Sequence, residues 1–194
     1  MTPRRAPRRG GTRARRAALR TTGALLTAGA ALLGEAGPGA AQAASRCDDV
    51  PGFHALDFRV GEWTVWVEGE QVGTNRITKV LSGCAVEEHW EAAGGGRGRS
   101  LFYDLPAESA WRQVWVTQRA LLPGGVEEKR QMDSPAGGVR FQGTVTRPDG
   151  ATYLDRTTLT PLAGGQVRQH IETSTDGGAT WRTTFDAEYR PAGA

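Results

Sequence analysis

Residues 56–67 read LDFRVGEWTVWV and contain the clearest structural signal in the chain. The glycine of the GEW segment allows the backbone to approach a neighbouring segment closely. After it, Trp63, Val65 and Val67 recur at every second position, so they share one face of an extended strand. This stretch predicts the opening strand of an antiparallel sheet with its apolar face turned toward a core.

Similar short runs follow at near-regular spacing to the end of the chain. Glycine- and proline-rich turns separate them, and no segment shows sustained helical periodicity. Closure removes the exposed edges of a long antiparallel sheet. We therefore expect an all-β fold, a single antiparallel up-and-down β-barrel of about 8–10 strands, with a two-layer sandwich as the alternative. The further expected strands are 72–80, 84–91, 99–104, 111–119, 126–132, 139–147, 152–160, 166–174 and 180–189.

The first 43 residues have the composition of an export signal. Eight arginines precede an apolar run of small residues at 21–33, and residues 41–43, AQA, match a cleavage site. Residues 15–20, RRAALR, resemble the twin-arginine pattern, with the general secretory route as the alternative. We expect a disordered or helical signal peptide at 1–43 and one folded domain at 44–194, in a secreted or periplasmic protein with no transmembrane segment after cleavage.

Removing this leader reverses the charge of the chain. The whole sequence has 24 Lys and Arg against 21 Asp and Glu. The leader holds eight arginines and only Glu35, which leaves 16 basic and 20 acidic residues in the expected mature domain. Nucleic-acid binding calls for a basic surface on the folded domain, so we expect no nucleic-acid partner.

The chain contains two cysteines, Cys47 and Cys84. In an oxidising compartment they can form a disulfide that ties the residues before the first strand to the third strand. A loop of this length makes such a bond worth about 3–4 kcal/mol in the chain-entropy model. Two unpaired thiols are the alternative.

Residues 174–181, STDGGATW, match the Ser-X-Asp-X-Gly-X-Thr-Trp pattern called an Asp box. Short serine and aspartate side chains accept hydrogen bonds from the amides of their own turn, and glycine adopts backbone angles that other residues avoid. A single box predicts a clamp on a hairpin turn rather than a glycosidase site. Its structural residues are Ser174, Asp176, Gly178 and Trp181.

Polar side chains share faces with apolar ones on several strands. Glu88 alternates in phase with Trp90, and Gln169 lies between two aliphatic residues of its strand. A buried carboxylate needs a partner, and we nominate Arg156 for Glu88. A purely structural ion pair, or an Arg156 that faces solvent, are the alternatives.

Two further strands bear on the interior. Trp111, Gln113 and Trp115 share one face, but apolar residues also occupy the other face, so this strand alone does not show which side faces in. Two tryptophans beside an amide are typical of a ligand pocket and also of a core. On the last strand, alternation places four residues inside: Trp181, Thr183, Phe185 and Tyr189.

The histidines and serines do not suggest catalysis or metal binding. His54, His89 and His170 lack a zinc-ligand spacing, and two of them fall on expected outer faces. No Gly-X-Ser-X-Gly elbow is present. We expect no metal and no cofactor.

Several motifs follow one another along the expected domain. They are Asp57-Phe58, Gly61-Glu62-Trp63, Gly83-Cys84, Glu88-X-Trp90, Gly98-X-Ser100, Tyr103-Asp104, Trp111-X-Gln113-X-Trp115, Val167-Arg168-Gln169 and residues 174–181. Their joint order resembles an exported bacterial family of unknown function, which is similar to the calycins, the lipocalin-like and fatty-acid-binding-protein-like barrels. The resemblance implies a cavity for a small apolar or amphipathic molecule and assigns no activity. Arg59 and Thr117 depart from it, standing where an aromatic residue and an aspartate are usual.

These observations lead to one main hypothesis and two alternatives. The main one is a secreted or cell-envelope protein that binds a small apolar or amphipathic ligand without assigned catalysis. The alternatives are an envelope interaction protein with a packed barrel and a barrel enzyme that uses Glu88 as a general base. The expected ligand-binding residues are Trp63, Glu88, Trp90, Gln113, Trp115, Arg156 and Gln169.

Overall fold

The computed structural model describes residues 46–133 and 137–193 of the chain. The signal peptide expected at 1–43 lies outside these residues. Within the described ranges, no helix has the length and apolar character needed to cross a membrane.

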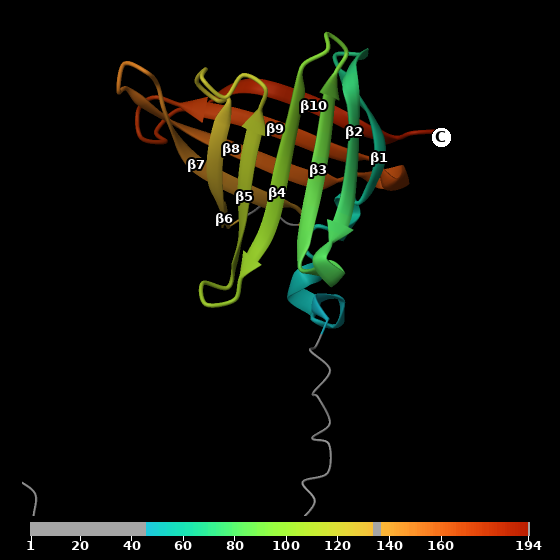
Figure 1. Ribbon diagram of the computed structural model, residues 1–194. Coiled ribbons are helices and arrows are strands. Elements are labelled where there is room, and N and C mark those ends of the chain that lie inside the picture. Colours follow the sequence, from blue (N-terminus) through green and yellow to red (C-terminus); the bar gives the residue numbers. More distant parts are fainter. Residues whose placement is uncertain (1–45, 134–136, 194) are drawn as a thin grey trace, which may run out of the picture. The chain divides into compact units, whose positions relative to one another are not determined.

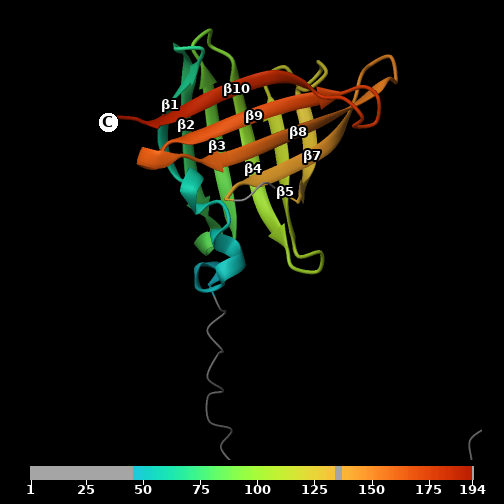
Figure 2. The same ribbon diagram turned by 180° about the vertical axis from the view of Figure 1, so that it is seen from behind.

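Ten antiparallel strands close into a single barrel (Figure 1). Each strand pairs with its neighbours in sequence, and β1 pairs with β10 to complete the ring. Figure 2 shows β8, β9 and β10 crossing obliquely in front of the strands of the opposite wall. The closed ring confirms the predicted all-β up-and-down barrel and excludes the sandwich. The strands are β1 Gly61–Val67, β2 Glu70–Val80, β3 Ala85–Ala92, β4 Arg97–Leu105, β5 Ala110–Thr117, β6 Val126–Met132, β7 Val139–Thr146, β8 Thr152–Pro161, β9 Val167–Ser174 and β10 Arg182–Pro191.

Short 3₁₀ turns precede the barrel and lie beneath one of its ends (Figure 1). They are η1 (Cys47–Asp49), η2 (Pro51–His54) and η3 (Asp57–Arg59). The expected first strand therefore begins later than its apolar pattern suggested, at Gly61. The turn at η3 is closed by a hydrogen bond from the Arg59 amide to the Leu56 carbonyl oxygen, at 2.9 Å. It leaves both Leu56 and Arg59 fully buried.

Apolar side chains fill the end of the barrel that these turns cover. Phe102 and Phe141 meet edge to face with ring centroids 5.4 Å apart. Trp111 packs against Phe53 at 6.0 Å and donates a hydrogen bond to the Gly52 carbonyl oxygen at 3.1 Å. The N-terminal turns thus cover the apolar core at this end, and the barrel interior is closely packed there.

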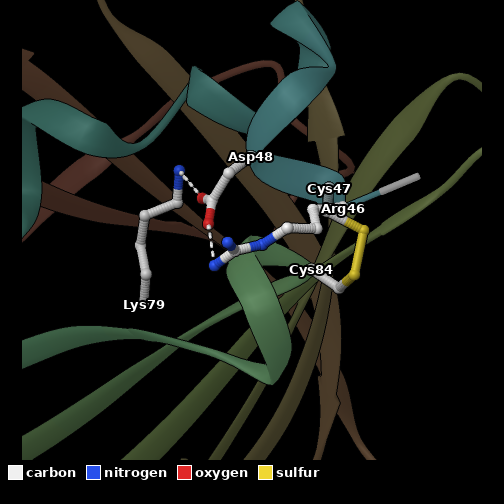
Figure 3. The surroundings of a disulfide bond; sticks show 5 residues. All are labelled: Arg46, Cys47, Asp48, Lys79 and Cys84. Carbon is white, nitrogen blue, oxygen red and sulfur yellow. Dashed lines mark ion pairs between the residues drawn. A yellow bond between two sulfur atoms is a disulfide. The ribbon is translucent and has the colours of Figure 1, made fainter. Parts of the chain in front are cut away.

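The predicted disulfide between Cys47 and Cys84 is present (Figure 3). It joins η1 to the residue that precedes β3. Beside it, Asp48 lies between two cations, 3.1 Å from Lys79 and 4.0 Å from Arg46. Because the bond closes a loop across 37 positions, it constrains the unfolded chain and anchors the covering turns to the barrel wall.

The last strand does not follow the expected alternation at its beginning. The register between β10 and β9 shifts between Thr183 and Phe185, which marks a β-bulge. The extra residue reverses the faces before it, so Thr183 bonds to His170 and Trp181 stacks on Arg156 on the outer face. The prediction that Trp181 and Thr183 face the interior is wrong, whereas the interior position of Phe185 agrees with the cavity described below.

The turn between β9 and β10 is held by hydrogen bonds within residues 174–181. The Ser174 hydroxyl oxygen accepts from the Gly178 amide at 2.8 Å, and Asp176 accepts from the Thr180 amide at 2.9 Å. The Trp181 indole N–H donates to the Gly178 carbonyl oxygen at 3.0 Å. Several hydrogen bonds lower the pKa of the Asp176 carboxyl, and the bond from the Thr180 hydroxyl has the largest effect.

Candidate functional site

A cavity of about 240 Å³ lies inside the barrel. Its lining comes from six of the ten strands, β3, β5, β6, β8, β9 and β10. The volume suits a small molecule rather than a long lipid chain. The lining residues are Glu88, Trp90, Gln113, Trp115, Glu127, Lys129, Asp155, Thr157, Gln169, Ile171, Phe185 and Tyr189.

Two indole rings border the cavity because glycines on adjacent strands make room for them. A Cβ at Gly73 on β2 would lie 2.6 Å from the Trp90 ring, and one at Gly98 on β4 would lie 2.2 Å from the Trp115 ring. Both distances are far below a normal contact, so only glycine allows these rings to lie flat against the backbone. A second hollow of about 250 Å³ at the rim shares Trp90 and Trp115 with the cavity.

A buried ion pair lies at the floor of the cavity. The Arg59 guanidinium is 3.2 Å from a carboxylate oxygen of Glu88, and it also donates to the Gln169 side-chain oxygen at 3.1 Å. The Asn75 amide donates to the same Glu88 oxygen at 2.6 Å. Since Arg59 and Glu88 are both almost fully buried, each charge depends on the other for compensation.

Aromatic rings enclose this ion pair. The Arg59 guanidinium lies 5.5 Å from the ring centres of both Phe102 and Tyr189, a geometry typical of cation–π contacts. Burial raises the pKa of the Tyr189 phenol, and the nearby negative charge of Glu88 raises it further, so the phenol keeps its proton.

A second charged cluster occupies the opposite wall. The Lys129 ammonium is 2.8 Å from Glu127 and 2.9 Å from the Thr157 hydroxyl oxygen, and it also donates to Asp155. Burial lowers the pKa of Lys129, but the two carboxylates outweigh it and the pKa is raised. Lys129 therefore remains an ammonium and is unsuited to act as a neutral nucleophile. The pKa of Glu127 is raised, mainly by its burial.

Gln113 contributes the remaining polar group of the lining. Its amide nitrogen donates to the Ser100 hydroxyl at 3.1 Å, while its side-chain oxygen is buried and has no hydrogen-bond partner among the described residues. Buried acceptors are nearly always satisfied in folded proteins. An unpaired acceptor that lines a cavity is a natural contact for the polar end of a ligand.

The structure brings together five of the seven residues expected to bind a ligand. Glu88, Trp90, Gln113, Trp115 and Gln169 all line the cavity.

Trp63 lies elsewhere, in the core. Its ring packs edge to face on Tyr189 at 6.3 Å, and its indole N–H donates to the Arg59 carbonyl oxygen at 2.9 Å.

Arg156 is not the partner of Glu88, and that prediction is wrong. Strand alternation turns Arg156 to the outer face, where it pairs with Glu172 at 2.7 Å and stacks on Trp181 at 3.8 Å. The partner of Glu88 is Arg59 instead, because the η3 turn directs the Arg59 side chain under the barrel toward Glu88. Arg59, one of the two residues that depart from the family resemblance, thus forms the central ion pair with Glu88.

The Lys129 cluster was not predicted from the sequence. β6 reads VEEKRQM, with charged residues on both faces, so alternation gave no sign of which side was buried. The burial of Asp155 was only weakly indicated, because Asp155 shares its face of β8 with the apolar residue Leu159, which is fully buried. Pairing of β7 with both β6 and β8 brings Lys129 and Asp155 into contact, and only the closed sheet shows this.

The described residues contain no group of three His, Cys, Asp or Glu side chains placed to hold a metal ion. Comparison of the chain with protein-family models finds no match, and a search of curated proteins finds none either.

Proposed function

We propose that this protein binds a small apolar or amphipathic molecule inside its barrel. The observation that carries the proposal is the interior cavity of about 240 Å³ with indole rings on one side and buried polar groups on the other. Ligand sites combine apolar walls with a few placed polar groups in this way. Glu88, Gln113 and Gln169 orient the polar part of the ligand, and Trp90 and Trp115 pack against the apolar part.

The same proposal places the protein outside the cytoplasm, as a secreted or cell-envelope protein. The disulfide between Cys47 and Cys84 supports this location, because such bonds persist in oxidising compartments. The expected signal peptide at 1–43 is the second argument for export.

Titration with 1-aminoanthracene, a small lipophilic fluorophore, tests binding. We expect saturable enhancement of its emission with one probe for each chain. Ile171→Trp should abolish the enhancement, because the larger side chain fills the cavity that Ile171 lines. Leu101→Trp is the matched control, since Leu101 is 41% exposed on the outer face. Absence of binding to the wild-type protein, or equal binding to the Ile171→Trp variant, would contradict the proposal.

A second candidate function is interaction with a second copy of the chain through the outer face. Apolar side chains pair across β4, β5 and β6 on that face, with Leu101 opposite Val114 and Val116 opposite Val126. Leu101, Val116 and Val126 are each more than 40% exposed. Exposed apolar patches mark interaction surfaces. Light scattering after size-exclusion chromatography would show a stable self-association, and a Val116→Lys variant should abolish it.

A further inference from the structure

The cavity carries more negative than positive charge. Its lining includes three carboxylates, those of Glu88, Glu127 and Asp155, and one cation, Lys129. Arg59, which is not a lining residue, compensates the negative charge of Glu88. Lys129 is left to compensate two carboxylates, so when both are ionised, one negative charge of the second cluster has no counter-charge among the interior residues that the structure describes.

Lys129 has no hydrogen-bond capacity left for a ligand. Its three N–H groups are taken by Glu127, Asp155 and Thr157. The two carboxylates keep acceptor capacity, because the ion pairs with Lys129 join it to one oxygen of each, Oε2 of Glu127 and Oδ1 of Asp155, and a carboxylate has two acceptor oxygens. The buried side-chain oxygen of Gln113, another lining residue, has no partner in the described parts of the chain. The polar wall therefore offers acceptors and an excess of negative charge.

The charged and titratable groups that face Glu127 are Lys129 on its own strand and Asp155 and Tyr153 on β8. Burial and the neighbouring Asp155 both raise the pKa of Glu127, and Lys129 offsets only part of this. A second positive charge in the cavity would favour the ionised carboxylate and relieve the repulsion between the two acids.

We propose that the ligand of this cavity is an amphipathic cation, a small amine with an apolar group, whose positive nitrogen lies beside Glu127 while its apolar part packs against Trp90 and Trp115. This inference rests on the proposed function, since it names the ligand class of the same cavity. A protonated amine donates hydrogen bonds to the acceptors of the polar wall, and indole faces attract cations as well as apolar groups.

Calorimetric titration with n-octylamine, 1-octanol and octanoate tests the inference, because these three probes have eight carbon atoms each and carry a positive, a neutral and a negative head group. Octylamine should bind at least about tenfold more tightly than the other two, as expected for a charge-assisted hydrogen bond in a buried site. Glu127→Gln should remove this preference. Glu128→Gln should retain it, because Glu128 is the exposed neighbour of Glu127 on the same strand.

The outcomes separate this inference from the proposed function. If 1-octanol or octanoate binds as tightly as octylamine, the cavity binds small molecules but the preference for cations is refuted. If none of the three probes binds and 1-aminoanthracene also fails, both proposals are refuted. The comparison of probes on the wild-type protein decides the question even if the Glu127→Gln variant does not fold.

Discussion

Replacing Glu88 by glutamine should destabilise the fold strongly. The Glu88 and Arg59 side chains are only 5% and 2% exposed, and their charged atoms are 3.2 Å apart. Glutamine keeps the shape of the side chain but leaves the Arg59 guanidinium buried without a counter-charge. Removing one partner of a buried pair costs about 3–5 kcal/mol. For a domain of this size the midpoint of thermal unfolding should fall by about 6–20 °C.

The matched control is Glu87→Gln on the same strand. Glu87 is 41% exposed and pairs with His89 on the outer face, so its substitution should change the unfolding free energy by less than about 1 kcal/mol. The double variant Arg59→Met/Glu88→Met should recover most of the loss, because apolar residues of similar volume can replace a buried ion pair. Urea unfolding followed by tryptophan fluorescence measures all four proteins.

Unfolding of the Glu88→Gln variant at the same urea concentration as the wild-type protein would refute the stabilising role of the ion pair. That result would mean that water or rearrangement compensates Arg59 without Glu88. It would also favour the alternative in which Glu88 is a general base, since that hypothesis expects loss of turnover with little loss of stability. The structure favours a structural role because Arg59 and Asn75 already bond to the same Glu88 oxygen.

Three further predictions follow from the disulfide, the cavity wall and the β9–β10 turn. Replacing both Cys47 and Cys84 by serine should lower the free energy of unfolding by about 3–4 kcal/mol, measured in urea without reductant. Gly98→Ala should cost about 1–3 kcal/mol and shift tryptophan emission, because the added methyl group overlaps the Trp115 ring. The folded-state pKa of Asp176 is lowered, mainly by the neighbouring threonine hydroxyl. Its ionised form therefore stabilises the fold fully above about pH 4, the unfolded-state value, and this contribution is lost as the pH falls toward the folded-state pKa. Thermal melts from neutral to acidic pH should show the wild-type protein losing its advantage over Asp176→Asn, and a constant difference would contradict this.

The barrel itself could be predicted from the sequence because its signals are local. Side chains alternate between two faces at every second residue of a strand, so Trp63 and Val65, or Glu88 and Trp90, reveal a shared face without knowledge of any other strand. Turn residues at short intervals divided the chain into ten strands. The interior positions of Glu88 and Gln169 followed from the same alternation, whereas that of Gln113 stayed open because both faces of its strand carry apolar residues.

Local alternation was insufficient wherever the backbone departs from a regular strand. The β-bulge between Thr183 and Phe185 adds one residue, which reverses the faces before it and moves Trp181 outside. The 3₁₀ turn at η3 directs Arg59 into the barrel, although the apolar residues around it resembled the start of a strand. Neither irregularity leaves a mark in a pattern of period two.

The sequence by itself determined which side chains lie on one strand face, because that depends on backbone geometry over a few residues. The tertiary structure decided which charges meet: Glu88 with Arg59 rather than Arg156, and Lys129 with Asp155. These partners lie 29 and 26 positions apart. The physical reason is that ring closure and strand register set the distances between such residues, and those distances decide which charges compensate one another once water is excluded.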